Sequence, residues 1–193
     1  MKTEREYRKA VEIRAAEDNY IVEGYATTFN EPYVMMEWDG VQYKEQIDRH
    51  AFEEADMSDV IMQFDHNGRV YARMKNGTLE LSTDDHGLKV RADLSKTGGS
   101  RSLYEDIKAG LISEMSFAFV VREDSYDSET HTRTIMKIKK VYDVSAVSIP
   151  ANPSTEISAR SYFDGVIEEE KAERLRAEAK EAQKRKIRLL CEI

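Results

Sequence analysis

The sequence predicts a β-rich α+β fold, in which a barrel-like, mostly antiparallel sheet carries a few flanking helices and a charged helix follows at the C-terminus. Three observations predict it. Short runs of β-branched and aromatic residues recur up to residue 94, two longer runs follow, and strong helix formers make up the final segment. So many strands would leave exposed edges in an open sheet, which favours a closed or barrel-like one.

Seven short strands and one short helix are predicted in the first half of the chain. Asp39-Gly40 and Asn76-Gly77 are turn pairs that tolerate positive φ, so each indicates a two-residue hairpin between the strands that flank it. The apolar run 60–64 is short for a helix and favours a strand. In chain order the expected strands cover 20–29, 33–38, 41–47, 60–64, 70–75, 78–82 and 88–94, and the helix covers 49–55.

A second helix and a long hairpin are predicted next. Ser102 and Glu105 fit a capping box, and Gly110 is suited to end the helix because glycine accepts a positive φ. Residues 111–121 and 132–149 predict two long strands that pair as a hairpin across a polar turn.

The C-terminal segment changes character after Ala151-Asn152-Pro153. From Val166 onward strong helix formers dominate, and small or apolar residues recur every three or four positions in a short heptad seam. The seam consists of Ala172, Leu175, Ala179, Ala182, Lys186, Leu189 and Ile193. It predicts a helix for assembly or partner binding, with a solvated tail as the alternative. We therefore divide the chain into an N-terminal extension (1–19), a main domain (20–160) and a C-terminal helical tail (161–193).

Composition argues against several kinds of protein. The 193 residues are 40% hydrophobic and carry a net charge of −8, which suits one globular domain and argues against a broad electrostatic grip on nucleic acid. No apolar run approaches the roughly 20 residues that span a bilayer, and the N-terminus lacks the apolar segment of a secretion signal. The single cysteine, Cys191, excludes an internal disulfide. We expect a soluble intracellular protein that binds neither nucleic acid nor a membrane.

No metal or cofactor site is predicted. The histidines are scattered, and neither His-x-x-x-His nor Cys-x-x-Cys spacing occurs. Gly98-Gly99 lacks the lysine and the length of a phosphate-binding loop. The four histidines are His50, His66, His86 and His131.

Three side chains with catalytic potential, His66, Ser116 and Asp143, each lie in an apolar, strand-like stretch. A hydroxyl nucleophile needs a base to take its proton, and the base needs a group that fixes its tautomer and stabilises its cation. The order His, Ser, Asp differs from the common triad orders, and no Gly-x-Ser-x-Gly elbow is present. The three residues therefore suggest a triad without implying a familiar hydrolase fold.

Each of these residues also has a purely structural interpretation. A buried strand serine such as Ser116 is commonly a small filler bonded to backbone, and Ser113, on the opposite face of the same strand, is a rival nucleophile. His66 continues the alternation of the strand before it, so it should share the inward face as a hydrogen-bonded core residue. Asp143 could pair with Lys139, because an unpaired buried carboxylate is costly.

Eight short motifs occur in a fixed order between residues 20 and 159. They are Glu23-Gly24-Tyr25-Ala26, Phe29-Asn30, Asp65-His66-Asn67, Asp84-Asp85-His86-Gly87-Leu88, Gly110, Met115-Ser116-Phe117-Ala118-Phe119, Asp143-Val144-Ser145 and Pro150-Ala151-Asn152-Pro153. In this order and at these separations they resemble the prohead maturation proteases of tailed bacteriophages, which are similar to the herpesvirus assemblin proteases.

The resemblance implies an assemblin-like protease domain over residues 20–160 and a serine endopeptidase without a cofactor. Such an enzyme would cut scaffold or capsid-protein extensions, and often itself. By motif position His66 would be the general base and Ser116 the nucleophile, while Asp143 stands where many relatives carry glutamate. The implied partners are the phage scaffold, the major capsid protein and further copies of the chain. The implied location is the assembling prohead in the host cytoplasm.

A non-enzymatic capsid-assembly protein with the same fold and a scaffold-binding helix is the competing interpretation. Geometry discriminates between the two. A peptidase should hold His66 and Ser116 within hydrogen-bond reach and bring Asp143 to the far nitrogen of His66.

Overall fold

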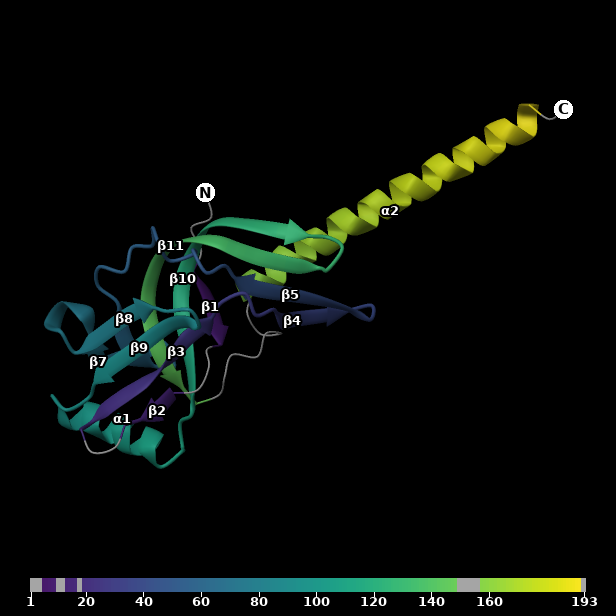
Figure 1. The fold of residues 1–193 in the computed structure, drawn as a ribbon. Coiled ribbons are helices and arrows are strands. Elements are labelled where there is room, and N and C mark those ends of the chain that lie inside the picture. The colour runs from purple at the N-terminus through teal and green to yellow at the C-terminus, as the bar shows by residue number, and fades with distance from the viewer. Residues whose placement is uncertain (1–4, 10–12, 17–18, 149–156, 192–193) are drawn as a thin grey trace.

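The computed structural model describes residues 5–9, 13–16, 19–148 and 157–191 (Figure 1). Its strands are β1 (Glu6–Lys9), β2 (Ile13–Ala15), β3 (Ile21–Thr28), β4 (Tyr33–Trp38), β5 (Val41–Ile47), β6 (Ile61–Phe64), β7 (Asn67–Arg73), β8 (Leu79–Thr83), β9 (Gly87–Asp93), β10 (Glu114–Asp127) and β11 (Thr132–Val147). The helices are the 3₁₀-helix η1 (Met74–Asn76), α1 (Gly98–Lys108) and α2 (Ile157–Cys191). The chain is mostly β, as predicted.

The strands form a seven-stranded mixed sheet and a four-stranded antiparallel sheet. The larger sheet has the order β1-β10-β11-β5-β4, and the smaller has the order β2-β3-β9-β8. The outer edge of β11 is shared, because β5 pairs in parallel with its beginning and β6 pairs in parallel with its end. Strand β7 then pairs with β6.

The described strands do not close into a barrel, so that part of the fold prediction is wrong. The two sheets instead share one hydrophobic core, to which Val22 and Val90 contribute from the smaller sheet and Met62, Phe117 and Val144 from the larger one. Apolar faces buried between two open sheets need no closure. The edges of the larger sheet remain short, since β1 has four residues and β4 has six.

One predicted hairpin is confirmed and the other is wrong. Asp39 and Gly40 adopt φ of 51° and 76° between the paired residues Trp38 and Val41, as a two-residue hairpin requires. Gly77, with φ of 72°, instead ends η1. The strands on either side of it belong to different sheets, since β7 pairs with β6 and β8 pairs with β9. The positive φ of Gly77 therefore lies in the connection that leads the chain from the larger sheet to the smaller one.

The helix predictions need two corrections. Residues 49–55 form successive turns, with Ala51 N–H donating to Asp48 and Glu53 N–H to His50, and no helix is assigned there. Helix α1 begins at Gly98. The residue that caps it is Thr97, whose hydroxyl accepts the Ser100 N–H at 3.1 Å, and not Ser102 as predicted. Gly110 follows its last turn with φ of 73°, as expected for a helix stop.

The long hairpin of β10 and β11 is confirmed with different bounds: β10 begins later and ends later than the predicted 111–121, and β11 ends at Val147. Pairing runs from Glu114 opposite Val147 to Asp127 opposite Thr132. The last predicted strand residue, Ile149, and the motif Pro150-Ala151-Asn152-Pro153 lie outside the described residues.

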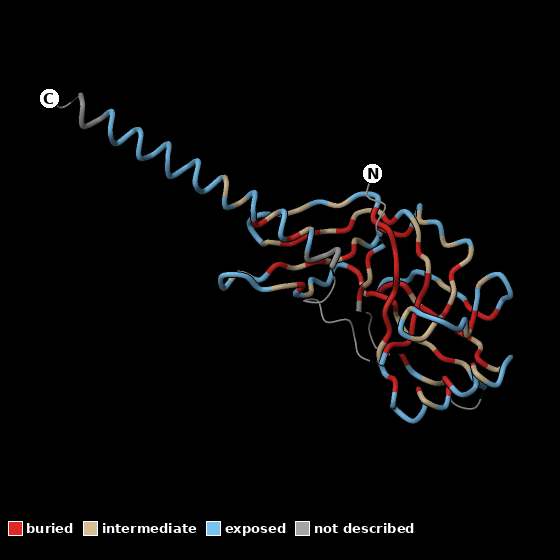
Figure 2. The backbone as a smooth tube through the Cα atoms, turned by 180° about the vertical axis from the view of Figure 1, so that it is seen from behind, coloured by how far each residue is buried: buried red, intermediate tan, exposed pale blue. Residues whose placement is uncertain are grey.

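Helix α2 begins at Ile157, earlier than the predicted Val166, so the predicted polar connector at 158–161 is helical. Phe163 and Ile167 are buried against Met35 and Tyr43. Beyond these turns α2 projects away from the body, and residues 173–187 are exposed (Figures 1 and 2).

The predicted seam from Leu175 to Lys186 lies in the exposed part of α2, where no other described residue covers it. Leu175 is 66% exposed. The side chain of Leu189 and residue Ile193 lie outside the described part. Among the described residues, the seam therefore makes no contribution to the packing of the body of the protein.

Two hydrogen bonds anchor the start of α2. The carboxylate of Glu170 accepts from the hydroxyl of Tyr43 at 3.0 Å and from that of Tyr126 at 3.1 Å. Burial, followed by the bond to Glu170, raises the pKa of Tyr43 to about 12, so this phenol remains a donor at neutral pH.

A buried ion cluster connects β1 to the centre of the larger sheet. Arg8 and Arg133 are buried together with Glu6 and Glu45. Glu45 Oε2 accepts from Arg8 at 2.8 Å and from Arg133 at 2.9 Å, and Arg133 also donates to Glu6 at 2.8 Å. Tyr33 donates its hydroxyl to Glu45 at 2.7 Å. These bonds compensate the desolvation of the four charges.

The lowered pKa of Glu6 is consistent with this compensation. Burial alone would raise it, but the hydrogen bonds and positive charges of Arg133 and Arg8 outweigh burial and lower the pKa from 4.5 to about 2. Because the folded-state value is depressed, the charged form stabilises the fold above about pH 4.5. That contribution is lost as the pH falls toward 2.

Replacing Glu45 by alanine should lower the free energy of unfolding by ~3–5 kcal/mol, because two buried guanidinium groups would lose a shared partner. Glu54→Ala is the matched control, since Glu54 pairs with Arg122 at the surface at 2.7 Å and should cost only ~0–1 kcal/mol. Urea unfolding followed by circular dichroism measures both. Equal losses in the two variants would contradict a dominant role for the cluster.

Candidate active site

The three predicted side chains come together on the face of the larger sheet that points away from the main core. Ser116 lies near the start of β10 and Asp143 near the end of β11. Their strand neighbours Phe117 and Val144 belong to the core, so the alternation of a strand directs Ser116 and Asp143 to the other face. Register brings them close, because Asp143 is opposite Ala118, two residues after Ser116.

His66 reaches this face from a turn and not from a strand. Asp65 and His66 adopt φ of 49° and 54° between Phe64 and Asn67, which pair across the β6–β7 hairpin. The prediction that His66 continues the inward alternation is therefore wrong. The two positive φ values turn the chain out of β6 before the histidine, and its side chain remains 17% exposed.

Asp65 holds this turn against the end of β11. Its carboxylate accepts from the backbone N–H and the hydroxyl of Ser148, both at 2.8 Å. Its own N–H donates to the carbonyl of Ala146 at 3.0 Å. Non-glycine residues in the left-handed region are uncommon and need such support. These three hydrogen bonds of Asp65 fix the position from which His66 approaches Ser116.

The distances are those of a hydroxyl, a base and an orienting carboxylate. His66 Nδ1 lies 2.6 Å from Asp143 Oδ1, and His66 Nε2 lies 2.7 Å from Ser116 Oγ. When Nδ1 donates to the carboxylate, Nε2 presents its lone pair to the Ser116 hydroxyl. Both Ser116 and Asp143 are buried. The hydrogen-bond reach expected of a peptidase is therefore present.

The structural alternatives fare differently. Ser116 bonds to a histidine, and Asp143 to His66 and not to the proposed partner Lys139. Ser113 is exposed, and its carbonyl accepts the N–H of Ile13. Of the two candidate serines, the structure thus places Ser116 beside His66.

Ser145 is part of this arrangement, and sequence reasoning assigned it no role. Its buried hydroxyl donates to Asp143 Oδ1 at 2.8 Å, the same oxygen that faces His66. The two residues are two positions apart on β11 and so share a face. That spacing was the sequence signal from which a contact between Ser145 and Asp143 could have been predicted. The bond orients the carboxylate, and the aspartate reaches the imidazole although it is one methylene shorter than glutamate.

A peptidase needs backbone N–H groups to hold the oxyanion that forms during attack, and the sequence offers Gly98-Gly99 as one candidate supplier. These two glycines form the first turn of α1. The guanidinium of Arg69 packs on Gly99 so closely that an added Cβ would lie 2.2 Å from Arg69 Nη1. Arg69 is exposed and its flexible side chain can move aside, so packing alone does not require glycine at this position.

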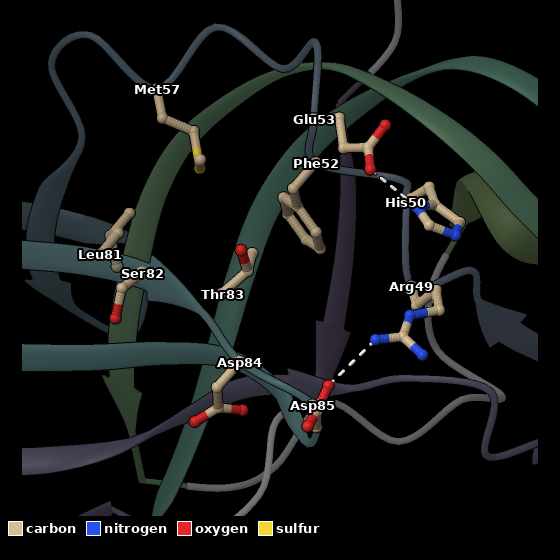
Figure 3. Close-up of a pocket in the computed structure, with 10 residues that line it drawn as sticks. All are labelled: Arg49, His50, Phe52, Glu53, Met57, Leu81, Ser82, Thr83, Asp84 and Asp85. Carbon is tan, nitrogen blue, oxygen red and sulfur yellow. Dashed lines mark hydrogen bonds and ion pairs between the residues drawn. The ribbon is translucent and has the colours of Figure 1, made fainter.

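A separate pocket of about 680 Å³ lies where the turns after β5 face β8 (Figure 3). Four of its ionic side chains pair with one another, His50 with Glu53 at 2.7 Å and Arg49 with Asp85 at 3.0 Å. None of the three candidate catalytic residues lines it. The hydroxyl–imidazole–carboxylate geometry, and not this pocket, identifies the candidate site.

Across the described ranges, no group of three or more His, Cys, Asp or Glu side chains is arranged to hold a metal ion. None of the helices that the structure describes combines the length and apolar character that crossing a membrane requires.

The chain matches a known protein family. A family described as caudovirus prohead serine protease matches residues 9–167 of the chain, which include His66, Ser116 and Asp143. No curated protein and no solved structure matches significantly.

Asp143→Asn should slow the reaction of Ser116 with a fluorophosphonate by up to ~10⁴-fold, because an amide can hold the imidazole in the wrong tautomer. Asp56→Asn is the matched control. Asp56 accepts at the surface from Lys140, which lies on β11 like Asp143, at 2.7 Å, and this variant should be labelled at the wild-type rate. Labelling rates measured by intact-protein mass spectrometry give the comparison. Wild-type reactivity in Asp143→Asn would exclude the orienting role.

Proposed function

Because the chain belongs to the caudovirus prohead serine protease family, we propose that it is a serine endopeptidase with Ser116 as nucleophile, His66 as general base and Asp143 as orienting carboxylate. Its substrates would be extensions of the scaffold or major capsid protein. The family places its action inside the phage prohead, and assembly in the host cytoplasm is part of the proposal. The observation that carries it is His66 between Asp143 and Ser116, at 2.6 and 2.7 Å.

The proposed reaction uses these side chains in sequence. Ser116 Oγ attacks the peptide carbonyl carbon while His66 Nε2 takes the hydroxyl proton. His66 then gives that proton to the leaving amine, and an acyl-serine remains. Water, deprotonated by His66, hydrolyses this ester and restores Ser116. Proton transfer by a positioned base contributes roughly 10²- to 10⁴-fold.

Asp143 and Ser145 support the charged stage of this cycle. When His66 carries the extra proton, the adjacent carboxylate of Asp143 stabilises the imidazolium without itself becoming protonated. The buried Ser145 hydroxyl donates to that carboxylate at 2.8 Å, and this bond holds the carboxylate in place. Since protonated His66 cannot act as a base, turnover requires the neutral imidazole.

The non-enzymatic assembly protein is the competing function. It predicts no constraint on the separation of His66 from Ser116. A buried serine and a buried carboxylate that converge on the two nitrogens of one imidazole instead favour the peptidase.

Incubating the protein with the scaffold and major capsid protein of its own phage should generate new termini, which mass spectrometry maps. Ser116→Ala should abolish this cleavage while the fold is kept, since one hydroxyl is lost from a small side chain. Ser113→Ala, the matched control, should retain most activity because Ser113 is exposed and its carbonyl, not its hydroxyl, is the group bonded to Ile13. An active Ser116→Ala or an inactive, folded Ser113→Ala would overturn the assignment of the nucleophile.

We extend the proposal to the projecting part of α2, which we call the arm (residues 174–191). From Arg174 to Cys191 the sequence holds seven Lys or Arg and two Glu, whereas the whole chain has a net charge of −8. A basic arm on an acidic protein suits an acidic surface on the scaffold or capsid protein, with a second copy of the chain as the alternative partner. Self-cleavage at 158–161 would require the first turn of α2 to unfold, because that segment is helical.

Truncation after Glu173 should leave cleavage of a short peptide unchanged but reduce incorporation of the protease into assembling shells. It removes the exposed arm and keeps the buried Phe163 and Ile167. Truncation after Arg160 is the contrasting variant, because it also removes these anchors and should lower the thermal stability. Normal incorporation without the arm, measured by quantifying protease in purified proheads, would exclude a docking role.

A further inference from the structure

The N-terminal strand lies along the part of β10 that carries the nucleophile. In the antiparallel register of β1 with β10, Lys9 is opposite Ser116 and Tyr7 is opposite Ala118. Ala118 is in turn opposite Asp143 on β11. Tyr7, Ala118 and Asp143 therefore form one row across three strands, directly beside the site.

The ring of Tyr7 contacts the imidazole of His66. Their centroids are 4.7 Å apart and the ring planes are inclined at 71°, an edge-to-face arrangement. This contact joins residues that are far apart in the sequence, and Tyr7 is not part of the hydrogen-bonded chain from Asp143 to Ser116.

The Asp65 bonds fix the backbone of His66, but they do not fix the orientation of its imidazole ring, so a contact with the ring itself matters. His66 lies in a two-residue turn, and its side chain is 17% exposed. Asp143 holds one ring nitrogen, and the partner of the other nitrogen is the reactive Ser116. The face and edge of the ring are free of these bonds, so a packed aromatic neighbour can limit rotation of the imidazole and exclude water from it.

The strand that carries Tyr7 is itself fixed. Glu6 and Arg8 flank Tyr7 and point to the opposite side of β1, where both belong to the buried ion cluster. Arg5 stacks over Tyr142, the residue before Asp143, at 3.8 Å from the ring centroid. The position of Tyr7 is thus set by charges buried in the sheet, and residues 6–8 precede the family match, which begins at residue 9.

From these contacts we propose that Tyr7 is a positioning residue for the proposed peptidase, delivered by β1 to hold the His66 imidazole between Asp143 and Ser116. The inference rests on the proposed function. Residues 6–9, which lie in the predicted N-terminal extension, would then be required for full turnover. The role belongs to the aromatic ring and not to the phenol hydroxyl, because the contact is one between rings.

Tyr7→Ala, Tyr7→Phe and Tyr25→Ala in the full chain test this role. Tyr25 is the matched control, because its ring makes a similar edge-to-face contact with His86, at 4.6 Å, in the smaller sheet. The measurements are kcat and KM on a cleaved peptide, the rate of fluorophosphonate labelling of Ser116, and the thermal unfolding temperature. We expect Tyr7→Ala to lower kcat and the labelling rate about tenfold with KM unchanged.

The two comparison variants separate positioning from folding. Tyr7→Phe should restore both rates to within about twofold of wild type, and Tyr25→Ala should leave them unchanged. If Tyr7→Ala does not fold, Tyr7→Leu, which fills space without a ring, takes its place and should be slower than Tyr7→Phe.

Three results would overturn the inference. A folded Tyr7→Ala with wild-type rates would show that the contact is dispensable. A Tyr7→Phe as slow as Tyr7→Ala would show that the ring contact is not the cause. Equal losses in Tyr7→Ala and Tyr25→Ala would indicate a general effect on stability. A wild-type protein that neither cleaves nor labels at Ser116 would instead refute the proposed function itself.

Discussion

The antiparallel pairing of β10 with β11 is the constraint on which the rest of the structure depends. It places Ser116 opposite Ser145 and Ala118 opposite Asp143, while the alternate residues Phe117 and Val144 enter the core. A slip of one residue would exchange the two faces, so burial of the core also fixes the site. Strands β1, β5 and β6 all pair with this hairpin, and the turn that carries His66 follows β6.

Buried charge is paired wherever it occurs on this sheet. The ion cluster joins Arg8 and Arg133 to Glu6 and Glu45, and Asp143 is bonded to His66 and Ser145. Among the described residues, no buried side-chain nitrogen or oxygen lacks a hydrogen-bond partner. Because unpaired buried charges are strongly unfavourable, both groups restrict the sheet to one arrangement. The N-terminal strand connects them, with Arg8 in the cluster and Tyr7 against His66.

Most strands could be predicted from alternation and turn chemistry, and the remaining features depend on partners that are distant in the sequence. Asp39-Gly40 gives a hairpin, whereas Asn76-Gly77, with the same local preference, joins two sheets because β7 and β8 have better partners elsewhere. The motifs singled out His66, Ser116 and Asp143, and the structure brings their side chains within hydrogen-bond reach of one another. The motifs could not reveal the left-handed turn at His66, the bond from Ser145, or Tyr7, whose contact with the site exists only once β1 joins β10.

The most direct test of the central claim is to identify the residue that a fluorophosphonate modifies. The tryptic peptide 109–122 contains both Ser113 and Ser116, so fragmentation must distinguish them. A working Asp143–His66–Ser116 site predicts one adduct, on Ser116, that forms at neutral pH and is lost in His66→Ala. An unmodified Ser116, an adduct on Ser113, or labelling that does not depend on His66 would contradict it.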